Sequence, residues 1–452
     1  MQIVQDMRKI SINTALLFML CGFLFIQSCG NKYEDQASLE LKDSELLIES
    51  LENLTDIIVH DIFSPPVASR VYVYPCVAAY EILALGDSSF NSLTGQLNGL
   101  DSIPVPDQRI SYSLAAIHAF NEVGQVLIFS EDKMEAFRSD LEKHLDTLDI
   151  PGKVKENSRS YAKMVSRHIL EWADKDNYKE SRSMPKHPIM SGESHWKPTP
   201  PAYMEGIEPH WRAIRPMVIP SADQFKPAPP PEFSMEKGSD FYKVTEEVYT
   251  AVNNATEEHR LIASFWDCNP YVMNQTGHVM IATKKITPGG HWMGIASIAA
   301  RSSKSGMMKT AEIITLTAVA LFDGFISCWD EKYRSNLIRP ETVINQYMDA
   351  DWQPILQTPP FPEHTSGHSV ISNAAAVALT AVLGDGFHFV DDVEVKYGLP
   401  LREFSSFEEA SSEAAISRLY GGIHYMPAIE DGVRQGKAVG HYIVSNIETY
   451  TL

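Results

Sequence analysis

Apolar residues recur at three- and four-residue spacing through most of this 452-residue chain, and that spacing limits the fold more than any other feature. The stretches "VYVYPCVAAYEILAL" and "KTAEIITLTAVALFDGFISCWDEKYR" show it clearly, whereas runs with strand-like alternation are few. Apolar residues at this spacing form one face of an amphipathic helix. We therefore predict an all-α fold, built as a helical bundle.

Residues 181–238 interrupt the helical pattern. Ten prolines lie between Pro198 and Pro231, which is too many for helix interiors. The chain is thus expected to contain an N-terminal helical region (39–180), a proline-rich loop (181–238) and a C-terminal helical bundle (239–452). Loops of such length are usually functional or disordered, and we expect this one to border or cover a site.

Residues 1–28 have the features of a lipoprotein signal peptide. A basic pair precedes an apolar run of 12 residues, Ala15 to Ile26, which is shorter than the ~20 residues that span a bilayer. The run ends in "IQSC", which resembles the bacterial lipoprotein cleavage box and implies lipid attachment at Cys29, followed by a tether over 29–38. Secretion with cleavage nearby is the alternative. We expect an exported protein, periplasmic or on the outer membrane or cell surface, that contacts the membrane only through its lipid anchor.

Charge and cysteine content narrow the classes of partner. The net charge is −20 and no tract is rich in Lys or Arg, which argues against nucleic acid as a partner. An acidic exterior repels anions at long range, so any anion site must gather its basic residues locally. Beyond the signal segment, Cys76, Cys268 and Cys328 are too widely spaced for a zinc pattern or a disulfide framework. One disulfide bridge or three buried thiols both remain open.

The first motif with chemical content is "KYRSNLIRP". Lys332 lies at the end of a long apolar helix, and Pro340 keeps Arg339 out of helical geometry. Two cations are thereby directed toward one place from different backbone directions. Taken alone this is a weak signal, because such a pair is usually solvated surface.

The second motif is "PEHTSGHSV", residues 362–370. Thr365 or Ser366 caps a helix that runs to Gly384. The backbone amides of Gly367 and His368 are then free to face a ligand oxygen, because a helix N-terminus attracts anions. Taken alone, the motif is better explained by a simple helix cap with an exposed histidine.

The third motif is "SRLYGGIHYMPAIEDG". Arg418 and His424 are separated by Gly421 and Gly422, which can interrupt the helix and turn His424 toward the other motifs. Alone it fits a structural histidine beside a surface arginine. With each residue type used about one time in twenty, all three motifs arise together by accident on the order of once in ten thousand chains.

Together the motifs Lys-x6-Arg-Pro, Ser-Gly-His and Ser-Arg-x5-His resemble the superfamily of type 2 phosphatidic acid phosphatases and vanadium-dependent haloperoxidases, over residues 332–424. In that superfamily the three segments meet inside a helical bundle around one phosphate or vanadate. The resemblance implies that His424 bonds the central atom directly and that His368 is the general acid–base. It also implies an oxyanion-binding set of Lys332, Arg339, Ser366, Gly367 and Arg418.

Two aromatic residues favour the larger, soluble haloperoxidase branch of this superfamily. Trp329 and Phe361 match positions that resemble the wall of a halide site, although core packing also explains aromatic residues there. This interpretation implies an oxidoreductase with vanadate as cofactor, His424 as its metal ligand, and peroxide and a halide as small-molecule substrates. One alternative is an exported acid phosphatase, a hydrolase of phosphomonoesters that works through a phosphohistidine and needs no cofactor. The other is a binding or structural lipoprotein whose oxyanion site is relict or only captures phosphate.

One position departs from the superfamily pattern. An acidic residue commonly lies four residues after the last histidine, where it can orient the imidazole, but this chain has Ala428 there. Asp431 lies farther along, about 10 Å from His424 in a regular helix. The sequence therefore does not identify the residue that orients His424.

Overall fold

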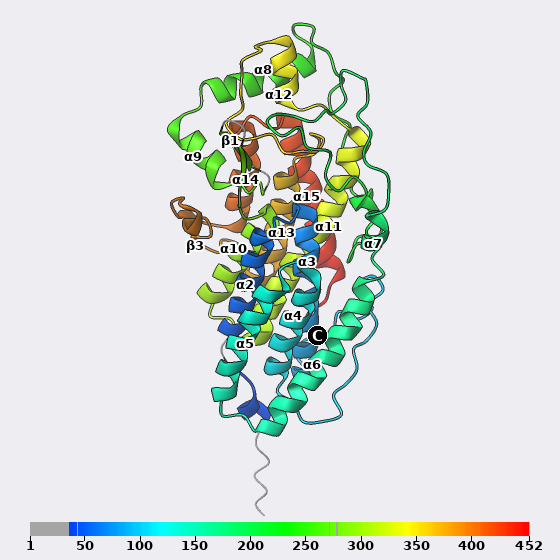
Figure 1. Cartoon of the computed structure of the whole chain (residues 1–452), viewed down its shortest axis with the longest axis vertical. Coiled ribbons are helices and arrows are strands. Elements are labelled where there is room, and N and C mark those ends of the chain that lie inside the picture. Colours follow the sequence, from blue (N-terminus) through cyan, green and yellow to red (C-terminus); the bar gives the residue numbers. More distant parts are fainter. Residues whose placement is uncertain (1–35, 43, 271, 277–278, 452) are drawn as a thin grey trace, which may run out of the picture. The chain divides into compact units, whose positions relative to one another are not determined.

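The computed structural model describes residues 36–42, 44–270, 272–276 and 279–451, and it divides into a unit of residues 1–40 and a unit of residues 41–452. In the first unit, Gln36–Leu39 form the short helix η1. The expected signal peptide (1–28), Cys29 and most of the expected tether lie outside the described residues. All other described helices and strands belong to the second unit (Figure 1).

The first half of the second unit is helical, as its periodicity predicts. Its helices are α2 (Glu45–His60), α3 (Pro65–Gly86), α4 (Tyr112–Leu127), α5 (Glu131–Thr147), α6 (Gly152–Ala173) and α7 (Tyr178–Ser181). Nearly every residue of α3 is buried. Pro65 and Pro66 occupy its first turn, where a missing N–H breaks no helical hydrogen bond.

The second half contains the helices that carry the three motifs. They are α8 (Asp240–Asn253), α9 (Glu257–Phe265), α10 (Pro288–Ser302), α11 (Met307–Ser335), α12 (Pro340–Tyr347), α13 (Gly367–Leu383), α14 (Phe407–Tyr420) and α15 (Met426–Asn446), with the 3-10 turns η2 (Trp211–Ala213) and η3 (Val395–Tyr397). Among the described residues, α11 alone is long and apolar enough to cross a membrane, but its apolar stretch is wholly buried within the protein. It is the central helix of the bundle, packed against α3, α10, α13 and α15.

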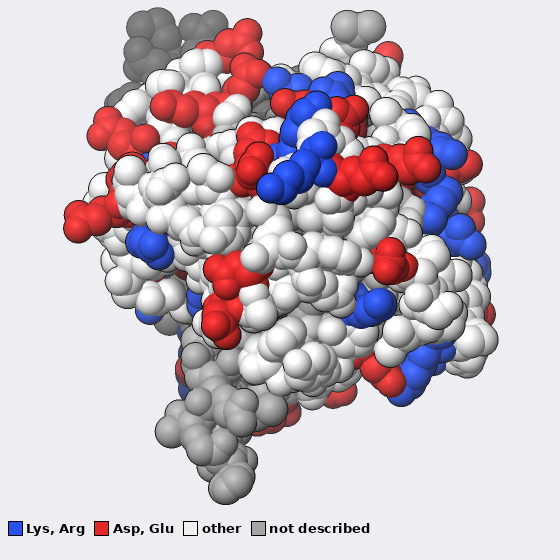
Figure 2. Space-filling model, turned by 90° about the horizontal axis from the view of Figure 1, so that it is seen from above, with Lys and Arg blue, Asp and Glu red and all other residues white. Residues whose placement is uncertain are grey.

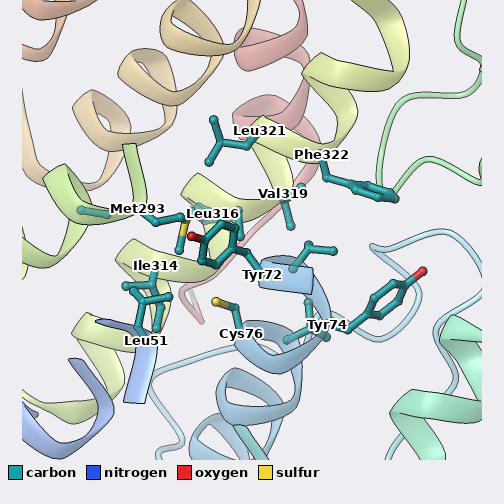
Figure 3. Close-up of a cluster of buried hydrophobic side chains, with 14 of the residues drawn as sticks. Leu51, Tyr72, Tyr74, Cys76, Met293, Ile314, Leu316, Val319, Leu321 and Phe322 are labelled. Atoms are coloured by element: carbon teal, nitrogen blue, oxygen red, sulfur yellow. The ribbon is translucent and has the colours of Figure 1, made fainter. Parts of the chain in front are cut away.

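The contact between α3 and α11 forms much of the core. Figure 3 shows Tyr72 and Cys76 of α3 lying among Leu316 and Val319 of α11, all of them buried. The Thr315 hydroxyl donates to the Cys76 carbonyl at 3.1 Å, so a polar side chain within this core is also satisfied. The three cysteines considered above are all buried and free, which excludes the disulfide bridge among them.

Helical periodicity did not predict two short pairs of antiparallel strands. Strands β1 (Val272–Thr276) and β2 (Val279–Thr283) pair antiparallel, with Val272 opposite Thr283. Strands β3 (Phe389–Asp391) and β4 (Arg402–Phe404) form the second pair. They are minor additions, and the all-α prediction is confirmed for the described residues. Such short strands escape periodicity analysis because three to five residues do not establish a period.

The proline-rich loop is irregular, as predicted, but it is firmly attached to the bundle. Asp323 of α11 accepts three backbone hydrogen bonds from this loop, from the amides of Met217, Val218 and Ile219 at 2.6, 2.8 and 3.0 Å. The carboxylate is fully buried, and burial raises its pKa to about 6. A buried carboxylate with three amide donors fixes the loop at one point on the central helix.

Helices α13 and α15 make the most extensive helix–helix contact of the structure, because α15 presents glycines to its partner. A methyl group on Gly436 would overlap the Val370 carbonyl, and one on Gly440 would lie 3.0 Å from the Ala374 carbonyl. This close approach brings the start of α13, with the second motif, beside the start of α15, just after the third.

Candidate active site

The first motif folds as its sequence predicts. Lys332 lies in the last turn of α11, which ends at Ser335, with Asn336 in the left-handed conformation at φ 48°. Arg339 is extended, at φ −78° and ψ 149°, and caps α12, which begins at Pro340. Both cations turn toward the face of Phe361, with Lys332 Nζ 4.9 Å and Arg339 Cζ 5.0 Å from the ring centroid.

The second motif also begins a helix. Ser366 caps α13 and accepts a hydrogen bond from the Ser369 amide at 3.3 Å. Thr365 is fully buried and donates through its hydroxyl to Gln435 of α15 at 2.7 Å. The amides of Gly367 and His368 lie in the first turn of α13, where no preceding helical carbonyl can accept from them.

The third motif turns as its glycines suggest. Helix α14 ends at Tyr420, Gly422 has φ +77°, and α15 begins at Met426, so His424 stands between two helices. Arg418, in the last turn of α14, donates to the Trp266 carbonyl at 2.7 Å. His424 receives a hydrogen bond on Nε2 from Arg339 Nη1 at 3.1 Å, which joins the first motif to the third.

The residue that orients His424 is Glu363, which sequence reasoning missed. Its Oε1 lies 2.8 Å from His424 Nδ1 and also accepts from the Tyr425 amide at 2.9 Å. Since an arginine can only donate, Nε2 of His424 is an acceptor and Nδ1 carries the proton. Glu363 therefore fixes the tautomer and leaves Nε2 unprotonated, so that a ligand bonding Nε2 would replace the hydrogen bond from Arg339.

His424 is oriented by a carboxylate even though Ala428 stands where the superfamily commonly has an acidic residue. Ala428 is fully buried, and its carbonyl accepts from the Ser366 amide at 3.0 Å, which links the second motif to α15. Asp431 pairs with Arg434 at 2.6 Å rather than with His424. The required carboxylate is supplied 61 residues earlier in the chain, from the loop before α13.

A small cavity of about 40 Å³ lies where the motifs meet. Six of the predicted site residues line it: Trp329, Phe361, Gly367, His368, Arg418 and His424. The other three, Lys332, Arg339 and Ser366, are fully buried behind this lining. Residues 267–270, which precede β1, also contribute to the lining and were not among the predicted site residues.

The aromatic pair forms one side of the cavity. The ring centroids of Trp329 and Phe361 are 5.0 Å apart with a 51° angle between the planes. Trp329 donates through Nε1 to the Ile207 carbonyl at 3.3 Å, so the proline-rich loop packs behind the pair. No described residue of 181–238 lines the cavity directly, and the expectation that this loop borders or covers a site stays a prediction.

The site is strongly cationic and buried. Lys332 donates to the carbonyls of Pro362, Glu363 and Thr365 at 3.1, 3.1 and 2.5 Å, and burial lowers its pKa to about 7. Burial likewise lowers the pKa of Arg339 and of Arg418 to about 10. Arg339 Nη2 is buried without a hydrogen-bond partner, a state that a bound anion would relieve.

The two histidines are held neutral. Burial, reinforced by neighbouring arginines, lowers the pKa of His368 and of His424 well below 6.5. His368 makes a hydrogen bond with the Trp266 backbone, and its Nε2 is buried without a partner beside the cavity. Burial also raises the pKa of Glu363 to about 7. The arrangement thus offers basic donors, one unprotonated imidazole nitrogen on His424 that accepts from Arg339 Nη1, and one unpaired imidazole nitrogen on His368.

The face shown in Figure 2 does not repeat this concentration of cations. On the face shown in Figure 2, Lys and Arg side chains alternate with Asp and Glu, and a broad area carries neither. Lys332, Arg339 and Arg418 are at most 1% exposed. The prediction that an acidic protein must gather basic residues locally to bind an anion is met inside the bundle.

Comparison with known proteins identifies the class. A family model described as the second helical-bundle domain of VCPO matches residues 312–451, which contain all three motifs. The crystal structure of the first bacterial vanadium-dependent iodoperoxidase matches with 54% sequence identity and a TM-score of 0.87, covering 91% of this chain and 98% of the other. No curated protein sequence matches significantly.

The fold extends to more distant structures. A bacterial vanadium-dependent chloroperoxidase in its holo form matches with a TM-score of 0.63 and 16% identity, covering 85% of this chain and 93% of the other. Its apo form matches equally well at 15% identity. The chain belongs to the vanadium haloperoxidase family, and the sequence-based assignment to this superfamily is confirmed.

Proposed function

We propose that this protein is a vanadium-dependent haloperoxidase that uses hydrogen peroxide to oxidise a halide, with iodide as the preferred one. The observation that carries the proposal is the state of His424, whose Nδ1 is held by Glu363 and whose Nε2 lone pair faces Arg339. A neutral imidazole oriented by a carboxylate is suited to ligate a metal. The 54% identity to an iodoperoxidase supports the same class of reaction.

The residues present fit vanadate as the cofactor. His424 Nε2 would bond the metal, and the unpaired Nη2 of Arg339 is a buried donor for one of its oxygens. Arg418, Ser366 and the Gly367 amide are further donors that we assign to the oxyanion. Bound vanadate would supply a Lewis acid that activates peroxide toward attack by the halide.

We assign Lys332 a role other than the direct oxyanion binding that the resemblance implied. Its three N–H groups are taken by the carbonyls of the loop that carries Glu363 and Thr365. We assign it two tasks: it holds this loop in place, and its charge offsets that of the oxyanion from behind the cavity wall.

His368 is assigned to proton transfer. Its Nε2 lies at the cavity without a partner, and its lowered pKa leaves it neutral and able to accept a proton from peroxide. Trp329 and Phe361 exclude water from the same space, which favours a large and weakly hydrated halide. Iodide is the halide that fits this apolar wall best.

The test is turnover by the purified chain with peroxide and iodide, before and after loading with orthovanadate. Turnover that depends on vanadate and is lost in His424→Ala supports the proposal. The same donors would also hold phosphate, so phosphomonoester hydrolysis is measured in parallel. Hydrolysis that vanadate inhibits, with no halide oxidation, would identify a phosphatase instead.

We also propose that the protein is exported and anchored through a lipid on Cys29. The support is the segment that ends in "IQSC", and it comes from the sequence alone. Expression of the full chain should yield a membrane fraction whose N-terminal peptide carries a lipid at Cys29, detected by mass spectrometry. A chain that stays in the membrane fraction after Cys29→Ala would contradict lipid anchoring.

A further inference from the structure

A second group of metal-binding side chains lies behind the wall of the cavity. Cys268 follows α9, His291 lies in the first turn of α10, and Glu394 precedes η3. Their ligand atoms lie within 4.8 Å of one another, and all three residues are buried. Asp391, at the end of β3, joins them from the other side of the imidazole. Three separate chain segments therefore converge here on one imidazole ring.

The distances suit a tetrahedral ion. Cys268 Sγ lies 3.5 Å from His291 Nδ1 and 3.7 Å from Glu394 Oε1, and Nδ1 lies 3.1 Å from the same carboxylate oxygen. A zinc ion with bonds of about 2.0–2.3 Å holds neighbouring ligand atoms about 3.3–3.8 Å apart. The three side chains are thus already near the spacing that one such ion requires.

The other imidazole nitrogen has the partner that a metal site needs. His291 Nε2 lies 2.7 Å from Asp391 Oδ2, and both side chains are 0% exposed. A carboxylate on the far nitrogen fixes the ring and directs the lone pair of Nδ1 toward the ion. The indole of Trp266 stacks on the same ring at 4.7 Å and holds it in that plane.

The net charge of the cluster is the same with zinc bound as with protons bound. With a protonated imidazole, a thiol and two carboxylates, the cluster carries one net negative charge. A zinc ion that displaces the proton on Nδ1 and the thiol proton leaves the net charge unchanged, because two charges replace two protons. The same buried surroundings can therefore accommodate either form.

From these observations we propose that Cys268, His291 and Glu394 bind one zinc ion, with Asp391 orienting His291, at a site that adjoins the oxyanion cavity but shares none of the residues assigned to the oxyanion. Cys268 also lines the cavity, which gives the ion a route inward. Cys268 lies two residues after Trp266, whose backbone forms hydrogen bonds with Arg418 and with His368. Bound zinc would thus hold the segment that positions two residues of the active site, whatever reaction that site catalyses.

The experiment measures zinc on the intact chain after treatment with a chelator and dialysis against Zn²⁺. We expect about one tightly held ion per chain in the wild type. Cys268→Ser should lose it, while the matched control Cys76→Ser, which removes another buried thiol that belongs to no such cluster of described residues, should keep it. His424→Ala should keep it as well, because that change disturbs only the oxyanion site.

Two further measurements guard against a variant that merely misfolds. Co²⁺ added to the wild-type chain should give the near-ultraviolet absorption of a cobalt–thiolate bond, which vanishes on addition of Zn²⁺. Asp391→Asn should weaken zinc binding by about 10–100-fold without abolishing it. The proposal fails if wild type and Cys268→Ser hold equal zinc, if no cobalt–thiolate band forms, or if only His424→Ala loses the ion.

Discussion

Glu363 Oε1 lies 2.8 Å from His424 Nδ1, and this contact determines which nitrogen of the histidine faces the active site. The carboxylate also accepts from the Tyr425 amide, so it orients the imidazole and the backbone beside it together. Both groups are buried, so water does not compete for the contact. Under the proposed function, a residue of the loop that precedes Ser366 thus fixes where the oxyanion binds.

Glu363→Gln should weaken vanadate binding by about 10–100-fold, because the amide lacks the charge that keeps the proton on Nδ1. Equilibrium dialysis with vanadate measures this directly. The matched control is Glu341→Gln, which removes another buried carboxyl group near Arg339 that does not bond His424. Equal losses in the two variants would contradict the orienting role of Glu363.

His368→Ala should separate binding from turnover. Vanadate affinity should change little, whereas kcat should fall by about 10²–10⁴-fold because a proton acceptor is lost. His364→Ala is the control from the same motif, since that imidazole is buried against Ala228 and does not line the cavity. A loss of vanadate binding that matches the loss of turnover would show that His368 is a ligand rather than an acid–base group.

Lys332 should make oxyanion affinity depend on pH. Burial lowers its pKa to about 7 in the free protein, and a bound anion favours the charged form. Above pH 7 the lysine must take up a proton on binding, so affinity should fall by up to about tenfold per pH unit. The comparison is the affinity profile of Lys332→Met, in which this fall is absent while the titration of vanadate itself remains. Parallel profiles would rule out the assignment.

The same shift affects the stability of the free protein. The unfolded lysine binds its proton below its ordinary pKa near 10.5, whereas the folded one binds it only below about 7. Between these values the unfolded state holds more protons, so the stability contributed by this residue is present above pH 10.5 and lost as pH falls toward 7. Denaturant unfolding of wild type and Lys332→Met across this range measures the effect: the stability of wild type relative to Lys332→Met should decrease as pH falls from 10.5 toward 7.

Gly436→Ala tests the helix contact that brings the motifs together. The added methyl group would overlap the Val370 carbonyl, and overpacking of this kind lowers the free energy of unfolding by about 1–3 kcal/mol. Gly152→Ala is the control, because a methyl group there meets nothing within 4 Å at the start of α6. Denaturant unfolding of both variants decides the point, and equal stabilities would contradict close packing at Gly436.

Much of the site could be predicted from local sequence, because local rules govern its backbone. Pro340 forces Arg339 into an extended conformation, Ser366 caps α13, and Gly422 takes a positive φ that few other residues adopt. Each of these depends on neighbours within a few residues. The backbone conformation at each motif follows from them.

The remainder depends on tertiary contacts that local rules do not contain. Glu363 bonds His424 from 61 residues earlier in the chain. The position four residues after His424, where an acidic residue is expected, holds the buried Ala428 instead. Cys268 lies beside His291 and Glu394 only because three separate segments converge. The proline-rich loop could be recognised as irregular from its composition, but its place behind Trp329 depends on distant contacts, among them the hydrogen bonds that Trp329 and Tyr333 donate to the Ile207 carbonyl.

The most direct test of the central claim is a crystal structure of the chain soaked with orthovanadate, with the metal located by its anomalous signal. We predict a vanadium peak within bonding distance of His424 Nε2, with the vanadate oxygens facing Arg339 and Arg418. A peak elsewhere, or a vanadate held without contact to that nitrogen, would contradict it.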